Sequence, residues 1–519
     1  MKQINSKFEL IGKLNQILKK GQLLTDLEDL YVYSFEKIFL DQIYIKPDIV
    51  VRNPSLTEEN EIKNLAEKDE IILIERGENI FPPLKNISTP IILLDKVEIP
   101  KLESCFDNAI QKDNFLLSSK KFPLSGYGTY RNLASAIQNL FIGKTLSKCQ
   151  NCTTCSGYCT VNPSFNGVET YSSKGRMLVS RGIMKGDLNI SEKVVDIIYN
   201  CTKCGLCFAQ CFQDLEFHEA ILHLRSRIAK SNLVPEIFHT ATNNIFEHGD
   251  PSAIPASRRL SRVKNYNKLN LPTTAENLCW LGCTVATRTP KTAESLLNIL
   301  THINIDYTML GEEEGCCGYV LISAGLWEEA NKVAISAIER IQKTKAKSLI
   351  TPCSGCYYTF TRLYPEILDV HIPCEILHTS QFLEKLIKNE RVNLNPLDIN
   401  VTYHDPCSLG RHSKVYDAPR NILKSIPNLK LKEMPMNRNC ARCCGGGGGL
   451  WSYNNNVSLE STQTRLKEDF FPLDVNILAT ACPQCQLNFR FASRIKNFAN
   501  RSLKICDITE LFELSMECK

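Results

Sequence analysis

Most of the chain's cysteines fall into four groups whose spacings are typical of metal sites rather than of disulfide bridges. The chain has 519 residues and 24 cysteines, of which only Cys105 precedes residue 149. With 43% hydrophobic residues, a chain of this length can bury several cores and needs no cross-links to fold. Clustered cysteines in such a protein more often hold metal or do redox chemistry than form structural bridges. Metal binding or redox chemistry is therefore the first expectation.

Two of the groups share the spacing Cys-x2-Cys-x2-Cys-x3-Cys of bacterial ferredoxins. Three thiolates at this step can hold three corners of a cubane, and the fourth cysteine of each run reaches the other cluster. We therefore predict two [4Fe–4S] cubanes. The expected ligands are Cys149, Cys152, Cys155 and Cys211 for one cluster, and Cys201, Cys204, Cys207 and Cys159 for the other. Paired zinc sites are the alternative, but tetrahedral zinc uses two separated CxxC pairs and needs no third cysteine at the same step.

The other two groups form an internal repeat of five cysteines each. The first set is Cys283, Cys316, Cys317, Cys353 and Cys356, and the second is Cys407, Cys443, Cys444, Cys482 and Cys485. In each copy the first cysteine ends an apolar strand ("NLCWLGC", "INVTYHDPC"), and the final pair follows another ("SLITPCSGC", "VNILATACPQC"). The repeat predicts two small α/β units with thiols at strand ends. Five thiols are one more than a cubane uses as terminal ligands, so a larger or differently shaped metal site is implied.

Five glycines follow the second cysteine pair in "CARCCGGGGGLW", residues 440–451. Neighbouring side chains of a strand point opposite ways, so aiming both Cys443 and Cys444 at one site needs a contorted backbone. The run 445–449 can take positive φ, bring main-chain N–H groups close to sulfur and leave space for a substrate. A flexible loop with buried thiols is the alternative, but such a loop would not recur in register with a distant strand-end cysteine and a CxxC pair.

The elements around these groups predict an α/β multidomain chain. Between Lys46 and Val97 we expect strand "DIVVRN", helix "TEENEIKNLAEK" and strands "EIILIERG" and "PIILLDKV". Helical stretches separate and follow the ferredoxin-type runs, and a proline-containing connector comes next. The expected parts are a small α/β region (1–125), an α-helical ferredoxin-type domain (126–235), a linker (236–275) and two cysteine-rich domains (276–395 and 396–519).

Composition excludes some classes of function. The net charge of +5 is weak for this length, and no long basic block is interleaved with aromatic residues, so nucleic acid is not an expected partner. The first residues lack the apolar core and cleavage site of a signal peptide, and no uncharged apolar run reaches membrane-spanning length. We expect a cytoplasmic protein, or one held at the membrane periphery by a partner.

Several stretches resemble the B and D subunits of heterodisulfide reductase. They are "TPCSGCYYTF", "VTYHDPCSLGRHSKVYDAPRNIL" and "CCGGGGGLW", and with "SSKGRMLVSRGIMKGDLN" they extend the resemblance from residue 149 to about 515, in the order of the D subunit. The helical insert between the ferredoxin-type runs resembles the C subunit of that enzyme and fumarate reductase iron–sulfur subunits. The resemblance implies a non-cubane [4Fe–4S] cluster at each five-cysteine set. It also implies that electrons pass from the cubanes to these clusters, which reduce the disulfide of coenzyme M and coenzyme B.

The architecture also resembles the iron–sulfur subunits of glycolate oxidase and anaerobic glycerol-3-phosphate dehydrogenase. At the front, "LLTDLEDLYVYSFEKI", "KPDIVVRNPSLTEENEIKNLAEK" and "IILIERG" resemble the opening of the FAD-binding domain of glycolate-oxidase-type flavoproteins. After Arg76 and Gly77, however, "ENIFPPLKN" stands where the glycine-rich pyrophosphate loop should follow. We therefore predict a truncated relative that does not bind FAD, with an α/β domain of unrelated origin as the alternative.

Reduction of a disulfide takes two electrons and two protons, so a proton donor is expected near the second set. The candidates for catalysis flank Cys407: they are His404, Asp405, Arg411 and His412. One could deliver protons, and Arg411 could bind an anionic substrate. The alternative is that His404 and Asp405 satisfy turn hydrogen bonds at a strand end.

Two further hypotheses stand beside the disulfide reductase. The chain could be an electron-relay subunit of a flavin-linked 2-hydroxyacid or glycerol-phosphate dehydrogenase, or a structural zinc protein, which would be colourless. In the disulfide reductase hypothesis, the resemblance implies a multisubunit complex with an electron-donating partner and a small disulfide or thiol substrate. The donor would be a flavoprotein, a hydrogenase or formate dehydrogenase-type module, or a membrane cytochrome.

Overall fold

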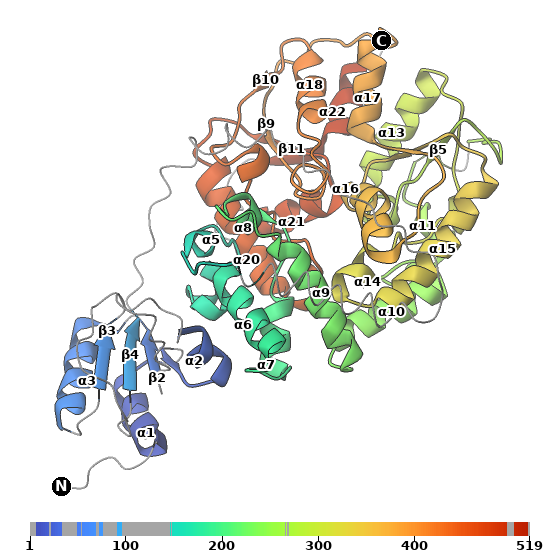
Figure 1. Ribbon diagram of the computed structural model, residues 1–519. Helices are drawn as coiled ribbons and strands as arrows, with labels where there is room; N and C mark the ends of the chain where they lie inside the picture. The colour runs from blue at the N-terminus through green and yellow to red at the C-terminus, as the bar shows by residue number, and fades with distance from the viewer. Residues whose placement is uncertain are drawn as a thin grey trace. The chain divides into compact units, whose positions relative to one another are not determined.

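The computed structural model of the chain (Figure 1) resolves the predicted elements into two compact units. It describes residues 7–19, 22–33, 49–52, 54–68, 72–75, 91–95, 146, 148–264, 266, 269–495 and 503–516. One unit contains the described residues up to Ile197, and the other contains those from Ile198 onward. This division falls inside the predicted ferredoxin-type domain, and the domain boundaries given above remain predictions.

The first unit begins with a four-stranded sheet of order β1-β2-β4-β3, in which β2, β4 and β3 are parallel and β1 is antiparallel. Its elements are α1 (Lys7–Ile17), β1 (Leu23–Leu24), α2 (Leu27–Tyr33), β2 (Ile49–Arg52), α3 (Leu56–Lys68), β3 (Ile72–Glu75) and β4 (Ile91–Asp95). Helix α3 starts at a capping box, because the Ser55 hydroxyl accepts from the Glu58 N–H and the Glu58 carboxylate accepts from the Ser55 N–H. The predicted three strands and helix are confirmed.

The rest of the first unit surrounds the first ferredoxin-type run. It contains α5 (Thr154–Gly157), η1 (Asn162–Phe165), η2 (Glu169–Tyr171), α6 (Ser173–Lys185) and the start of α7 (Glu192–Tyr199). The N-terminal sheet region is tied to this part by two hydrogen bonds. Thr170 Oγ1 donates to Asp29 at 2.5 Å, and Arg52 Nη1 donates to the Asn166 carbonyl at 2.9 Å. These bonds hold the loop after Cys159 against α2 and β2.

The second unit opens with helices around the second ferredoxin-type run. They are α8 (Leu206–Ala209), α9 (Phe217–Lys230), α10 (Glu236–His248) and α11 (Ala256–Arg259). The helical periodicity predicted for α9 is confirmed. Helices α10 and α11 occupy the stretch expected to be a connector, and Pro235 and Pro255 are their N-cap residues.

The two cysteine-rich copies have the same all-parallel sheet, with strand order β6-β5-β7-β8 in one and β10-β9-β11-β12 in the other. The strands are β5 (Asn277–Cys279), β6 (Tyr307–Thr308), β7 (Ser348–Thr351), β8 (Glu375–His378), β9 (Asn400–His404), β10 (Lys430–Leu431), β11 (Ile477–Thr480) and β12 (Lys504–Asp507). Each strand occupies the same place as its counterpart in the other copy. The α/β class and the internal repeat are therefore confirmed.

Helices of the two copies connect and cover these sheets. The first copy has α12 (Cys283–Arg288), α13 (Pro290–His302), α14 (Tyr319–Ala324), α15 (Trp327–Lys343), α16 (Ser354–Tyr358), η5 (Thr359–Leu368) and α17 (Thr379–Lys388). The second has α18 (Asp417–Ser425), α19 (Leu450–Tyr453), α20 (Asn455–Arg465), η7 (Leu466–Phe470), α21 (Pro483–Ser493) and α22 (Ile508–Met516). One hydrophobic core spans both copies and includes Leu281 and Leu300 of the first and Leu409 and Phe512 of the second. The copies therefore pack as one body.

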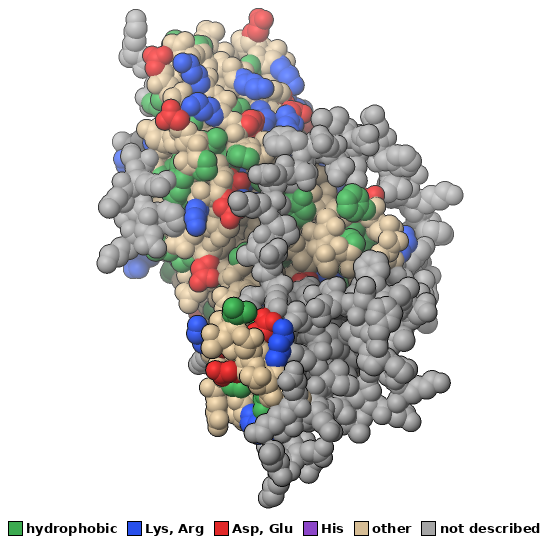
Figure 2. All heavy atoms as spheres, turned by 90° about the vertical axis from the view of Figure 1, so that its left-hand side faces the viewer, with side chains coloured by type: hydrophobic (Ala, Val, Ile, Leu, Met, Phe, Trp, Pro, Cys, Tyr) green, Lys and Arg blue, Asp and Glu red, His purple; other side chains and the backbone are tan. Residues whose placement is uncertain are grey.

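Two features of the described surface and helices bear on possible partners. In the view of Figure 2, acidic and basic side chains are mixed over the described surface, with no large area of one sign. None of the helices within the described residues combines the length and the apolar character needed to cross a bilayer.

Candidate metal centres

Each five-cysteine set lies at the carboxyl edge of a parallel sheet. In the first copy β5 pairs with β7, and Cys283 and Cys353 follow the ends of these strands. In the second copy β9 pairs with β11, with His404 opposite Thr480, and Cys407 and Cys482 follow. Because the carboxyl ends of neighbouring parallel strands open on the same edge, cysteines distant in sequence approach each other there.

The five thiols of the first set form a continuous row. Cys316 lies in side-chain contact with both Cys283 and Cys317, and Cys356 lies in contact with both Cys317 and Cys353. The row therefore runs from Cys283 through the adjacent pair to the CxxC pair.

The second set repeats this row position for position. Cys443 contacts Cys407 and Cys444, and Cys485 contacts Cys444 and Cys482. No disulfide bridge is formed among the cysteines of the described part of the chain. The structure thus gathers each predicted set of five in one place, in the same order in both copies.

A glycine turn follows each adjacent cysteine pair. The N–H of Gly318 donates to Cys316 Sγ at 3.3 Å, and the N–H of Gly445 donates to Cys443 Sγ at 3.4 Å. Both glycines have positive φ, 76° and 81°, so the chain turns sharply directly after each pair. The contorted backbone expected from the sequence is present in both copies.

The remaining glycines of the five-residue run serve close packing. Of residues 445–449, only Gly445, Gly448 and Gly449 have positive φ. A Cβ on Gly448 would lie 2.6 Å from the carbonyl carbon and oxygen of Thr202, and one on Gly446 would lie 2.8 Å from the side chain of Asn488. The space expected for a substrate is filled by protein atoms, because the loop lies directly against the second ferredoxin-type run.

The second thiol of each adjacent pair is the more acidic one. Contacts with Cys316 and Cys356 hold the pKa of Cys317 well below its usual value, despite burial. Contacts with Cys443 and Cys485 do the same for the pKa of Cys444. A thiolate is the form that binds metal.

The two ferredoxin-type runs share one backbone pattern. The N–H of Asn151 donates to Cys149 Sγ, and the N–H of Lys203 donates to Cys201 Sγ, both at 3.4 Å. The second residue after the first cysteine has positive φ in each run, as does the fourth, which is Thr153 or Gly205. Alternating left-handed residues curl main-chain N–H groups around an anion.

The runs belong to different units, so the exchange of Cys159 and Cys211 between clusters remains a prediction. Within the first unit, Arg176 Nη1 donates to Cys159 Sγ at 3.5 Å. Within the second unit, Cys204 contacts Cys443 of the second five-cysteine set.

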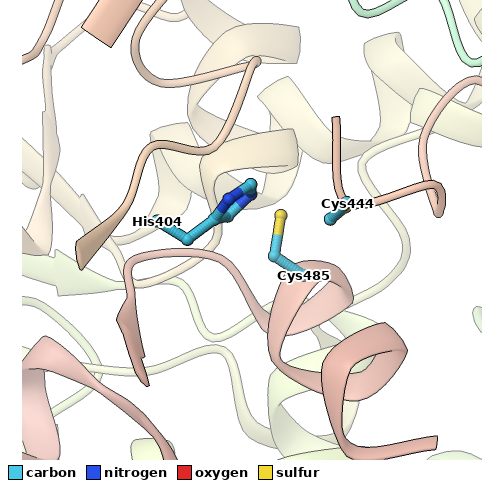
Figure 3. A group of neighbouring side chains, drawn as sticks. All are labelled: His404, Cys444 and Cys485. Carbon is cyan, nitrogen blue, oxygen red and sulfur yellow. The ribbon is translucent and has the colours of Figure 1, made fainter. Parts of the chain in front are cut away.

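Of the four candidate catalytic residues, His404 lies against two thiols of the second set, Cys444 and Cys485. Figure 3 shows the Cys485 sulfur pointing from α21 toward the His404 ring, and Cys444 lies on the opposite side of this sulfur from the ring. One ring nitrogen and both sulfurs lie within 4.8 Å of one another. The ring is 1% exposed, and neither of its nitrogens has a hydrogen-bond partner in the described part of the chain. Burial lowers the pKa of His404, which favours the neutral imidazole.

The other three candidates are occupied by structural contacts. Asp405 forms a bidentate ion pair with Arg420, at 2.7 and 2.8 Å, and also accepts from the N–H of Arg438. This favours the turn-stabilising interpretation of Asp405 over proton delivery.

Arg411 and His412 both reach the second ferredoxin-type run. Arg411 donates to the carbonyls of Cys204, Asn439 and Ala441, at 2.7 to 2.8 Å. The His412 Nε2 donates to the Lys203 carbonyl at 3.0 Å. Burial alone would lower the pKa of Arg411, but the neighbouring thiols of Cys204 and Cys407 raise it. These contacts join the run to the second set, while Arg411 Nη2 has no hydrogen-bond partner among the described residues.

Sequence reasoning missed two residues that shape the site. Trp280 stands three residues before Cys283, as His404 stands three before Cys407, and aligning the repeats one step further would have found it. Arg225 of α9 is fully buried and donates to the carbonyls of Ser323 and Gly448 and to three carbonyls of residues 198–201. It therefore joins the second run to both cysteine-rich copies, a role that only its place on the apolar face of a helix could have suggested.

The donor sets fit iron–sulfur clusters. Each five-cysteine set supplies more sulfur than tetrahedral zinc coordinates, and backbone N–H groups point at the thiols in all four groups. Thiolate ligands with N–H···S bonds around them are the usual environment of such clusters.

Comparison with known proteins agrees with this fit. A 4Fe–4S dicluster domain matches residues 145–215, and a cysteine-rich domain matches twice, at residues 278–361 and 401–490. The D subunit of the dihydromethanophenazine:CoB–CoM heterodisulfide reductase of Methanosarcina barkeri is 29% identical over 362 residues, covering 66% of this chain and 88% of that protein. The corresponding protein of Methanosarcina acetivorans, with the same name, is 30% identical over 329 residues, covering 62% of this chain and 78% of that protein.

A relative with a different name is the probable iron–sulfur-binding oxidoreductase FadF of Bacillus subtilis. It is 28% identical over 348 residues, covering 64% of this chain and 48% of that protein. Two matches to the cysteine-rich domain, one to the dicluster domain and 30% identity over most of the Methanosarcina acetivorans protein together define the relationship. The chain belongs to the family of iron–sulfur oxidoreductases that resemble the D subunit of heterodisulfide reductase.

Proposed function

We propose that the chain reduces a small disulfide of the coenzyme M–coenzyme B type at its two five-cysteine sets. In this proposal Cys149, Cys152, Cys155 and Cys211 hold one [4Fe–4S] cubane, and Cys201, Cys204, Cys207 and Cys159 hold the other. Each five-cysteine set holds a non-cubane [4Fe–4S] cluster. When bound, these groups supply the electrons that convert one disulfide and two protons into two thiols.

The observation that carries the proposal is the identical row of five thiols in both copies, with Cys353 of one row in the neighbourhood of Cys482 of the other. Cys353 of the first set and Cys482 of the second lie close enough for their charges to interact. The copies are held together at this point, because Ser354 Oγ and His378 Nε2 of the first both donate to the Ala481 carbonyl of the second, the former at 2.5 Å. Two adjoining sites suit a substrate with two sulfur atoms.

Contacts on the other side of the second set support electron entry from the second ferredoxin-type run. Cys204 contacts Cys443, and the glycine loop packs on Thr202. Arg411 lies between the two groups and holds the Cys204 carbonyl at 2.8 Å. Such direct packing is the arrangement that short-range electron transfer requires.

The test is thiol release by the anaerobic, iron-loaded protein. After chemical reduction and removal of the reductant, the coenzyme M–coenzyme B heterodisulfide is added and free thiols are measured. We expect thiols in proportion to the electrons stored. Cys443→Ser should abolish the release and lower the iron content, whereas Cys440→Ser, three residues away and outside the row, should retain both.

An electron-relay subunit is the second candidate, and the relative FadF favours it. In that case the chain would release no thiols from the heterodisulfide, yet a flavoprotein partner given a 2-hydroxyacid would reduce its clusters. The N-terminal region is proposed to lack FAD, so the relay would need this separate flavoprotein and the purified chain alone would not oxidise the hydroxyacid.

A further inference from the structure

The residue three positions before the first cysteine carries a buried ring nitrogen in both copies. It is Trp280 in the first and His404 in the second, with exposures of 0% and 1%. Among the described residues, Trp280 Nε1 and both ring nitrogens of His404 have no hydrogen-bond partner. Burial of an N–H group without an acceptor is unfavourable, so an acceptor is expected at each site.

The two rings are held in the same way. Trp280 lies edge-on to Phe360, with ring centroids 5.2 Å apart, and His404 lies edge-on to Phe489 at 4.8 Å. Each phenylalanine stands four residues after the last cysteine of its set: Phe489 lies on α21 with Cys485, and Phe360 lies on η5, which directly follows the α16 helix of Cys356. The repeat has therefore kept the ring, its support and its position while changing the chemistry of the ring.

A cysteine sulfur lies in the neighbourhood of each ring. A ring nitrogen of His404 lies within 4.8 Å of Cys444 Sγ and Cys485 Sγ. Trp280 Nε1 lies 3.9 Å, and Cys356 Sγ 2.9 Å, from the point where a Cβ on Gly282 would stand. Cys356 and Cys485 are equivalent members of the two rows.

We propose that Trp280 and His404 are matched positioning residues that donate a ring N–H to sulfur at the two five-cysteine sites and so raise the reduction potential of the cluster held there. The inference rests on the proposed clusters. An N–H···S bond favours the more negative, reduced cluster over the oxidised one, because it stabilises the added charge on sulfur.

The duplication argues for donation over iron ligation by His404. An indole N–H donates and cannot bind iron as a neutral ring, so a ligand at His404 would have no counterpart in the first copy. A donor is a role that both rings can share, whichever tautomer the imidazole takes.

The experiment measures cluster potentials by anaerobic redox titration with electron paramagnetic resonance. His404→Phe keeps the edge-on contact with Phe489 and removes the nitrogens, and Trp280→Phe is the matched change in the first copy. His404→Asn and His404→Gln each restore one N–H, at the places of Nδ1 and Nε2. Iron content and the spectra of the unaltered chain are measured as well. If the unaltered chain holds no clusters, the proposed function is refuted, and this outcome is distinguished from a failure of the present inference.

We expect each phenylalanine variant to lower the potential of one cluster signal, a different signal in the two variants, with iron content unchanged. The loss of one N–H···S bond should change the one-electron equilibrium about tenfold, which is about 59 mV. At least one amide variant should restore the His404 signal. Unchanged potentials in iron-replete phenylalanine variants would overturn the inference, as would a shift that neither amide restores.

If the His404→Phe variant loses iron, the potentials of the His404→Asn and His404→Gln variants test the inference instead. An unchanged potential in an iron-replete amide variant supports donation. Loss of iron in both amide variants would show that the imidazole is needed as a ligand, and the inference would be wrong.

Discussion

Replacement of Gly448 by alanine tests whether the glycine run exists to pack against the second ferredoxin-type run. Gly448 has φ of 61°, and an added Cβ would lie 2.6 Å from the carbonyl carbon and oxygen of Thr202 and 2.9 Å from the Cys201 carbonyl oxygen. These are backbone atoms beside predicted cluster ligands, so they cannot turn aside as the end of a flexible side chain could.

Two costs add in the Gly448→Ala variant. Holding alanine in the left-handed region costs about 1–2 kcal/mol. Forcing a methyl group into filled space costs about 1–3 kcal/mol more. The free energy of unfolding of the second unit should therefore fall by about 2–5 kcal/mol. The displaced loop should also loosen the contact between Cys443 and Cys204.

The assay is urea unfolding of the iron-loaded protein, followed by circular dichroism and by cluster absorbance. Gly186→Ala, in the first unit, is the control for the conformational cost by itself, because Gly186 has φ of 83° but nothing within 4 Å of its added Cβ; its loss is read from the unfolding of that unit. Equal losses for the two variants would refute the packing argument. A larger loss for Gly448→Ala, together with earlier loss of cluster absorbance, is the expected result.

Two further predictions concern buried charges of the second unit. Arg225→Lys should lower the free energy of unfolding by about 3 kcal/mol or more, because one ammonium group cannot bind all the carbonyls that the guanidinium binds. The control, Arg227→Lys on the exposed face of α9, should change the free energy of unfolding little. Equal urea midpoints for the two variants would contradict the proposed role of Arg225 in joining these segments. Asp507 is buried with Oδ2 unpaired, and burial raises its pKa to about 7. The carboxyl of Asp507 loses its proton at a lower pH in the unfolded chain than in the folded one, so the free energy of unfolding should fall as the pH rises from about 4 to about 7. Asp507→Asn should reduce this fall, measured as urea midpoints across the same pH range. An unchanged slope would exclude Asp507 as its source.

The cysteine groups could be identified from sequence because their geometry is largely local. A ferredoxin-type run wraps its ligands by backbone turns within a few residues, and strand-end cysteines are placed by short apolar strands that are evident in "SLITPCSGC" and "VNILATACPQC". The repeat then showed which distant cysteines correspond, so the order of elements in both copies was predicted.

The roles of the residues around Cys407 could not be predicted in the same way. His404, Asp405, Arg411 and His412 look equivalent in "YHDPCSLGRH", yet His404 lies against Cys444 and Cys485 whereas Arg411 neighbours Cys204 and Cys407. Asp405 is held by Arg420, and Arg411 by a carbonyl 207 residues away. Which polar group a side chain meets depends on segments that are adjacent only after folding.

The sequence by itself therefore determined the grouping and spacing of the cysteines and the α/β repeat, because these depend on local backbone geometry and on periodicity. Tertiary structure alone decided that the glycine run is packed rather than open, that Arg225 joins three segments, and that Trp280 and His404 occupy equivalent places. Those facts depend on close approach between distant segments, where excluded volume and the pairing of buried polar groups select one arrangement.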